Sequence, residues 1–178
     1  MTAHKLEIIA EPGTTTILTR RVVDAPRPLV FDAFPKPEHL KRWMGPRELT
    51  MVSCDSDLRV GGSYRFVHRA PDGQEFAFSG VYREIVRPER LVRTFVFEPM
   101  PDDEALETLT LEESGGKTTI NTLTLHKTVA GRDGHLADGR METGMTDGYA
   151  RIDELLLSLQ ANCPANPLFS RKGNSHRR

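Results

Sequence analysis

Cysteine and long apolar runs are scarce in this chain of 178 residues. Its two cysteines, Cys54 and Cys163, cannot form the disulfide framework of a small secreted domain, and they show no spacing typical of a metal site. No apolar stretch is long enough to cross a membrane, and residues 1–12 mix charged with apolar side chains instead of forming a signal peptide. We therefore expect a cytoplasmic protein without membrane insertion.

An excess of charge of one sign is also missing. The 24 basic and 25 acidic residues give a formal net charge of -1, so no overall field would attract nucleic acid or an anionic membrane. The six histidines lack the ligand spacing of metal sites, and the chain contains neither a phosphate-binding Gly-rich loop nor a Gly-x-Ser-x-Gly elbow. The sequence thus predicts no nucleic acid partner, no metal and no cofactor.

A long amphipathic segment near the end of the chain follows a series of short strand-like runs. From Gly139 to Gln160, apolar residues recur at steps of three and four, which is typical of one helical face. The earlier runs are rich in Val, Ile, Thr, Phe and Tyr and are separated by turn signals. They predict seven antiparallel strands, at Thr15–Val23, Leu49–Asp57, Ser63–Arg69, Glu75–Val86, Leu91–Glu98, Leu106–Glu113 and Lys117–Lys127.

The segments between these strands carry further signals. Prolines and apolar residues indicate two short helices, Pro28–Phe34 and Glu38–Trp43, between the first two strands. Gly80 inside a long strand predicts a bulge or a sharp bend. The segment Thr128–Arg140 is expected to be a polar loop, with a lid function left open.

The length of the chain suits one domain. We place that domain at residues 15–160, after an N-terminal extension of residues 1–14. The tail at residues 161–178 is rich in Pro, Asn and Ser, and we expect it to be disordered.

Alternation along three strands places aromatic rings on one face. These rings are Tyr64, Phe66, Phe76, Phe78, Tyr82, Phe95 and Phe97. With Met145 and Tyr149 on the helix above, they would line an apolar pocket. Trp43 would either stand near the entrance of this pocket or anchor its own short helix. A solid core without a cavity is the alternative that the sequence leaves open.

Catalysis would require polar groups on the same face. His68 and Glu84 fall on its period, as does Arg93, and an acid or base there could act on a bound aromatic or carbonyl compound. Polar strand ends that face solvent are the alternative.

On the final helix, Gly144 and Gly148 allow close approach by the sheet or a ligand and leave a homodimer open.

Several short motifs occur in an order that resembles a known family. They are WMGP at residues 43–46, RVGGSYRF at 59–66, GVYREI at 80–85, PERLV at 88–92 and GMTDGY at 144–149. The chain resembles the activator of heat-shock protein 90 ATPase homologue domain of the START and birch-pollen-allergen superfamily, also called SRPBCC or helix-grip. The resemblance implies an α+β fold in which a curved, seven-stranded antiparallel sheet wraps around a long C-terminal helix.

The same resemblance implies several functions, because this superfamily includes lipid and hormone carriers as well as polyketide cyclases and aromatases. We expect binding of a small hydrophobic or aromatic molecule in a cavity between the sheet and the helix, in a carrier or sensor. One alternative is a cyclase-like, aromatase-like or hydrolytic enzyme that uses His68 or Glu84. The other is a chaperone-interacting protein of the ATPase-activator type.

Overall fold

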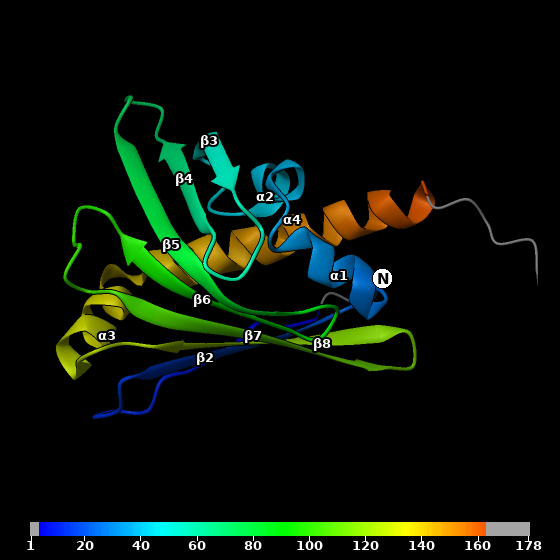
Figure 1. The fold of residues 1–178 in the computed structure, drawn as a ribbon, viewed down its shortest axis with the longest axis horizontal. Coiled ribbons are helices and arrows are strands. Elements are labelled where there is room, and N and C mark those ends of the chain that lie inside the picture. Colours follow the sequence, from blue (N-terminus) through cyan, green and yellow to red (C-terminus); the bar gives the residue numbers. More distant parts are fainter. Residues whose placement is uncertain (1–3, 163–178) are drawn as a thin grey trace, which may run out of the picture.

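The computed structural model describes residues 4–162 as an antiparallel sheet that curves around a long helix (Figure 1). The strands pair in the order β1-β2-β8-β7-β6-β5-β4-β3. They are β1 (Glu7–Ile9), β2 (Thr16–Val23), β3 (Thr50–Ser56), β4 (Ser63–Arg69), β5 (Glu75–Val86), β6 (Arg90–Phe97), β7 (Ala105–Ser114) and β8 (Lys117–Leu125). The helices are α1 (Arg27–Ala33), α2 (Pro37–Trp43), α3 (Val129–Leu136) and α4 (Arg140–Ala161), with a 3-10 turn at Ala137–Gly139. The α+β class is confirmed.

The sheet has eight strands, so the expected count of seven is wrong. The additional strand, β1, pairs with β2 and sets Ile8 opposite Thr19. It lies within the segment that the sequence analysis assigns to an extension, and three residues are too few for a recognisable alternation. Most of the expected tail, residues 163–178, lies outside the described residues.

The segment Thr128–Arg140 is mostly helical, which corrects the expected polar loop. The Thr128 hydroxyl accepts a hydrogen bond from the Gly131 backbone N–H at 3.0 Å and so caps α3 at its N-terminus. Gly131 and Gly134 lower the helix propensity of this stretch, which explains why sequence patterns missed it. Figure 1 shows α3 at one end of the sheet, near the beginning of α4.

At Gly80, β5 packs very closely against both neighbouring strands. A Cβ atom on Gly80 would lie 2.0 Å from the Thr94 carbonyl oxygen and 2.7 Å from the Tyr64 ring, so only glycine fits there. The pairing register of β5 with β6 shifts between Tyr82 and Glu84, a few residues later. The irregularity in β5 therefore lies between Tyr82 and Glu84 and not at Gly80 itself. Figure 1 shows β3, β4 and β5 rising away from the other strands around α4.

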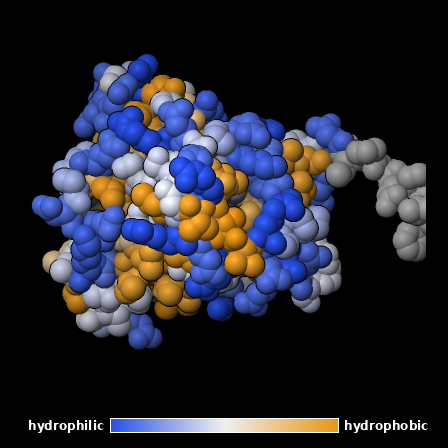
Figure 2. Space-filling model, in the orientation of Figure 1, coloured by the Kyte–Doolittle hydropathy of each residue, from blue (hydrophilic) through white to orange (hydrophobic). Residues whose placement is uncertain are grey.

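One stripe of α4 is buried against the inner face of this curved sheet. Tyr149, Ile152, Leu155 and Leu156 are each at most 2% exposed, and their steps of three and four match one face of the predicted helix. None of the described helices is long and apolar enough to span a membrane. Figure 2 shows a mainly hydrophilic face with a hydrophobic area near its middle.

The two glycines on α4 face the turn that follows α2. A Cβ atom on Gly144 would lie 3.5 Å from the Pro46 ring, and one on Gly148 would lie 3.4 Å from the Trp43 carbonyl oxygen. Both distances are ordinary or slightly tight contacts. The glycine pair therefore serves close packing within the chain, and this face of α4 is not free for a second copy.

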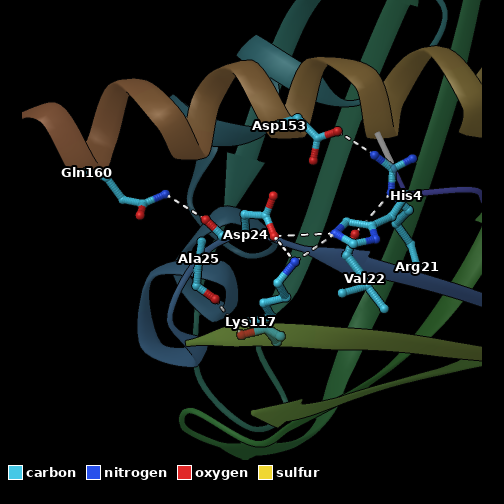
Figure 3. Close-up of polar contacts among 9 residues, drawn as sticks. His4, Arg21, Val22, Asp24, Ala25, Lys117, Asp153 and Gln160 are labelled. Carbon is cyan, nitrogen blue, oxygen red and sulfur yellow. Dashed lines mark hydrogen bonds and ion pairs between the residues drawn. The ribbon is translucent and has the colours of Figure 1, made fainter. Parts of the chain in front are cut away.

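A group of polar contacts fixes the C-terminal half of α4 to the end of β2 (Figure 3). The Arg21 guanidinium pairs with the Asp153 carboxylate, and the Arg21 side chain is only 9% exposed. The Gln160 amide donates to the Asp24 carbonyl oxygen at 3.0 Å, while Lys117 Nζ lies 2.9 Å from the Asp24 carboxylate. Two of these contacts therefore join α4 to β2 and the residue after it, and the third joins that residue to β8.

We predict that Gly80→Ala strongly destabilises the protein. The new methyl group would overlap a carbonyl oxygen of the neighbouring strand, and backbone cannot move aside as a flexible side chain can. The expected loss in the free energy of unfolding is about 3 kcal/mol, measured by urea denaturation. Gly134→Ala is the control, because nothing lies within 4 Å of its Cβ position, and alanine favours a helix. A loss below about 1 kcal/mol for Gly80→Ala would contradict this account.

Candidate functional site

The ring residues predicted to line a pocket fall into two groups that differ in burial. The first group is sealed in the core, with exposures between 0% and 6%: Trp43, Tyr64, Phe66, Tyr82 and Tyr149. The second group is only half-buried: Phe76, Phe78, Phe95, Phe97 and Met145. The inner face is therefore a closed core at one end and a partly open apolar surface at the other.

A row of stacked rings connects these two ends. The Phe66 and Phe78 ring centroids lie 5.2 Å apart, and those of Phe78 and Phe95 lie 5.5 Å apart. The row continues to His135 on α3, whose ring stacks on Phe95 at 6.2 Å. We call Phe76, Phe78, Phe95 and Phe97 the aromatic wall. Its outer end lies beneath α3.

Trp43 belongs to the closed end, so it does not stand at an entrance. Its side chain is 6% exposed in total, and its indole N–H donates to the Ala33 carbonyl oxygen at 2.7 Å. The ring also meets Phe34 edge-on at 5.1 Å. Of the two roles that the sequence left open, Trp43 performs the anchoring one, because it holds α1 and α2 together.

His68 lies on the aromatic face, as its position in the strand predicts. Its ring meets Phe66 and Phe78 nearly at right angles. Burial and the positive charge of Arg151 lower the pKa of His68 to about 4, so the imidazole is neutral at pH 7. Its Nδ1 atom has no hydrogen-bond partner among the described residues. A ligand or a water molecule that reaches this atom would meet a polar group.

Glu84 lies on the opposite face from the aromatic rings, contrary to the expectation. The register shift after Tyr82 places Glu84 opposite Val92 and returns Ile85 to the inner face opposite Leu91. The Glu84 carboxylate instead pairs with Arg90 Nε at 3.2 Å, and its side chain is 45% exposed. Simple alternation fails here because a bulge adds one residue to one strand.

Arg93 reaches the inner face and forms a buried ion pair that the sequence analysis did not foresee. Its Nη2 atom lies 2.7 Å from Oε1 of Glu107, and the guanidinium lies over the Tyr64 ring at 4.8 Å. The two charged side chains are 3% and 18% exposed, respectively. Glu107 stands directly opposite Arg93 in the β6–β7 ladder, and only that register could have revealed the pair.

Two histidines join α3 to the end of β8. His126 Nε2 lies 3.1 Å from His135 Nδ1, so one ring donates a hydrogen bond to the other. Burial lowers the pKa of both imidazoles. The Asp103 carboxylate lies 3.9 Å from His126 Nδ1. Among residues 4–162, no group of three or more His, Cys, Asp and Glu side chains is arranged to hold a metal ion.

A cleft of about 590 Å³ lies between β1 and the beginning of α4. Its lining is Lys5, Leu6, Glu7, Ile8, Ile9, Leu136, Gly139, Met141, Glu142 and Thr146. The last turn of α3 separates this cleft from the aromatic wall, because Leu136 lines the cleft and the adjacent His135 stacks on Phe95. Sequence patterns do not predict this cleft, because three of its ten lining residues belong to the unpredicted strand β1.

The fold and these features define the family of the chain. Residues 24–157 match the family described as activator of Hsp90 ATPase homolog 1-like protein. Because this match spans well over half of the chain, the protein belongs to that family, within the SRPBCC or helix-grip group of folds. The predicted resemblance is thus confirmed. No curated protein matches the chain.

Solved structures with this fold cover nearly the whole domain. A protein from Rhodobacter sphaeroides is 27% identical, with a TM-score of 0.78 over 87% of this chain and 99% of that one. A protein from Nitrosomonas europaea is also 27% identical, with a TM-score of 0.74 over 83% and 97% of the two chains. The AHSA1-like protein from Aeromonas hydrophila shares the fold at 16% identity, with a TM-score of 0.60 over 92% and 99%.

The lowered pKa of His68 predicts a loss of stability in acid. Its value of about 4 in the folded chain lies below the ordinary 6.5, so the unfolded chain binds a proton that the folded chain does not. The linked stability is complete above pH 6.5 and is lost as the pH falls towards 4. The loss is about 3 kcal/mol. Urea denaturation across this range should therefore show a flatter pH profile for His68→Leu than for wild type, and parallel profiles would contradict the prediction.

Proposed function

We propose that the protein binds a small hydrophobic or aromatic molecule on the aromatic wall, between the sheet and α4. The observation that supports this proposal is that Phe78 and Phe95 are only half-buried although they face the concave side of the sheet. Burying apolar surface stabilises a protein by about 25 cal/mol per Å². A bound apolar molecule would gain this stabilisation for the exposed parts of both rings.

The aromatic wall is ordered before any ligand arrives. The planes of Phe66 and Phe78 differ by 22°, and those of Phe78 and Phe95 differ by 25°. Phe78 therefore lies between two rings that are nearly parallel to it. A preorganised surface loses little side-chain entropy on binding, which favours a ligand with rigid rings.

The cleft beside β1 is the other position in which a ligand could lie under α4. Its volume of about 590 Å³ is within the range of small-molecule sites. Leu6, Ile8 and Met141 supply apolar lining, whereas Lys5 and Glu142 add charges of opposite sign. We favour the aromatic wall because it carries more apolar ring surface and lies beside buried polar atoms that can orient a ligand.

A catalytic role for this protein and its interaction with a chaperone are still predictions from the sequence. Glu84 does not face the inner surface, which removes one of the two proposed catalytic groups. His68 keeps a free nitrogen, but its ring is enclosed by Phe66 and Phe78, and a Cβ on Gly45 would lie 2.6 Å from it. Binding by a carrier or sensor requires only the surface that these rings provide.

The proposal predicts that Phe95→Ala weakens binding of the neutral fluorescent probe N-phenyl-1-naphthylamine. Loss of one ring from the aromatic wall should raise the Kd by about tenfold, measured by fluorescence titration. Met141→Ala, in the cleft, should change the Kd by less than about twofold. Leu123→Ala controls for general effects on folding, since Leu123 lies on β8 and is 39% exposed.

A larger effect of Met141→Ala than of Phe95→Ala on the Kd of the probe would place the ligand elsewhere. If Met141→Ala weakens the probe and Phe95→Ala does not, the ligand occupies the cleft and the proposed position is wrong. If wild-type protein binds no probe and its native mass includes no added small molecule, the ligand-binding function itself is contradicted.

A further inference from the structure

The buried ion pair beneath the aromatic wall has one unused acceptor atom. Both Nε and Nη2 of Arg93 lie close to the same oxygen of Glu107, Oε1, at 2.9 and 2.7 Å. Neither of these two contacts uses the other carboxylate oxygen of Glu107, Oε2. An ionised carboxylate offers about four lone-pair positions, so a further hydrogen-bond donor can bind there.

The two partners differ in what they present to the interior. The Arg93 side chain is 3% exposed and is covered by the Tyr64 ring, whereas the Glu107 side chain is still 18% exposed. The cation is therefore sealed below the surface, and the carboxylate stands above it. A molecule on the inner face would meet an acceptor and not a guanidinium.

The pairing of β6 with β7 places Glu107 opposite Arg93, two residues from Phe95 along the ladder. Burial raises the pKa of Tyr149, on α4, to about 12, and the charge of Glu107 acts in the same direction. Burial and the neighbouring His126 lower the pKa of His135, on α3, while Glu107 and Asp103 oppose them. Because His135 also stacks on Phe95, Glu107 lies at the foot of the aromatic wall.

We propose that Oε2 of Glu107 accepts a hydrogen bond from the ligand and selects apolar ring compounds that carry a neutral hydroxyl or N–H group. This inference rests on the proposed function, since it needs a ligand on the aromatic wall. The Arg93–Glu107 pair has no net charge, so a neutral donor adds none. An ammonium group would bring an unbalanced charge into an apolar site, and an anionic group would face the carboxylate.

Three probes with the same ring system test this selectivity. 2-Naphthol carries a neutral donor, 2-methoxynaphthalene carries none, and 2-naphthoate carries an anion. We expect wild-type protein to bind 2-naphthol about tenfold more tightly than 2-methoxynaphthalene, and 2-naphthoate most weakly. Titration by probe fluorescence or calorimetry gives the three values of Kd.

Variants at the ion pair separate ligand selection from structural support. Glu107→Gln should reduce the preference for 2-naphthol to about threefold, because a neutral acceptor forms a weaker hydrogen bond, and should leave the Kd of 2-methoxynaphthalene unchanged. A purely structural role would weaken both neutral probes together and would overturn the inference. Glu112→Gln, on the same strand and exposed, is the matched control and should keep the wild-type preference.

A second variant covers the case in which Glu107→Gln does not fold. The double substitution of Arg93→Leu and Glu107→Leu removes both charges and leaves no unpaired charge in the core. It should bind 2-methoxynaphthalene and lose the preference for 2-naphthol. If wild-type protein binds both neutral probes equally, the inference is wrong while the proposed function stands. If it binds none of the three, the proposed function fails as well.

Discussion

The close approach of β5 to β6 at Gly80 is the constraint on which the rest of the structure depends. The Tyr64 hydroxyl donates to the Thr94 carbonyl oxygen at 2.6 Å, and its ring fills the space that a side chain on Gly80 would need. This contact joins three strands two residues before the pairing register of β5 with β6 shifts. The sheet curves around α4 (Figure 1), and the rings of β4 and β5 lie on its concave side. A flat sheet would expose them and would have no concave side.

Short helices cover the two ends of the concave side to different extents. Where α1 and α2 lie, the Trp43 ring and its hydrogen bond to Ala33 close the core against the buried stripe of α4. At the other end, the His135 ring of α3 stacks on Phe95, which is still only half-buried. The closed end supplies stability and holds α4 in place. The open end can therefore keep apolar surface available to a ligand without loosening the domain.

Much of this architecture follows from sequence patterns, and the failures have identifiable physical causes. The period of α4 and the alternation in β4 predict the correct faces, because long elements give many independent observations of one period. Alternation predicts the wrong face for Glu84, since the residue types around Tyr82 do not indicate the bulge that follows it. No sequence pattern predicts which rings are buried, because the burial of a ring depends on how helices distant in the chain pack against the sheet. Glu107 was missed for the same reason: its importance arises from an opposite strand.

The polar atoms within this apolar surface are the strongest argument that the surface has a binding role. A buried ion pair seldom stabilises a fold more than a well-packed apolar pair of similar volume would. Arg93 and Glu107 therefore bring little stability that hydrophobic side chains could not provide. The structure nevertheless covers the guanidinium with Tyr64, and both contacts of Arg93 with Glu107 use the same carboxylate oxygen. With the proposed ligand bound above this arrangement, the second carboxylate oxygen would serve recognition and the buried cation would keep the carboxylate in position.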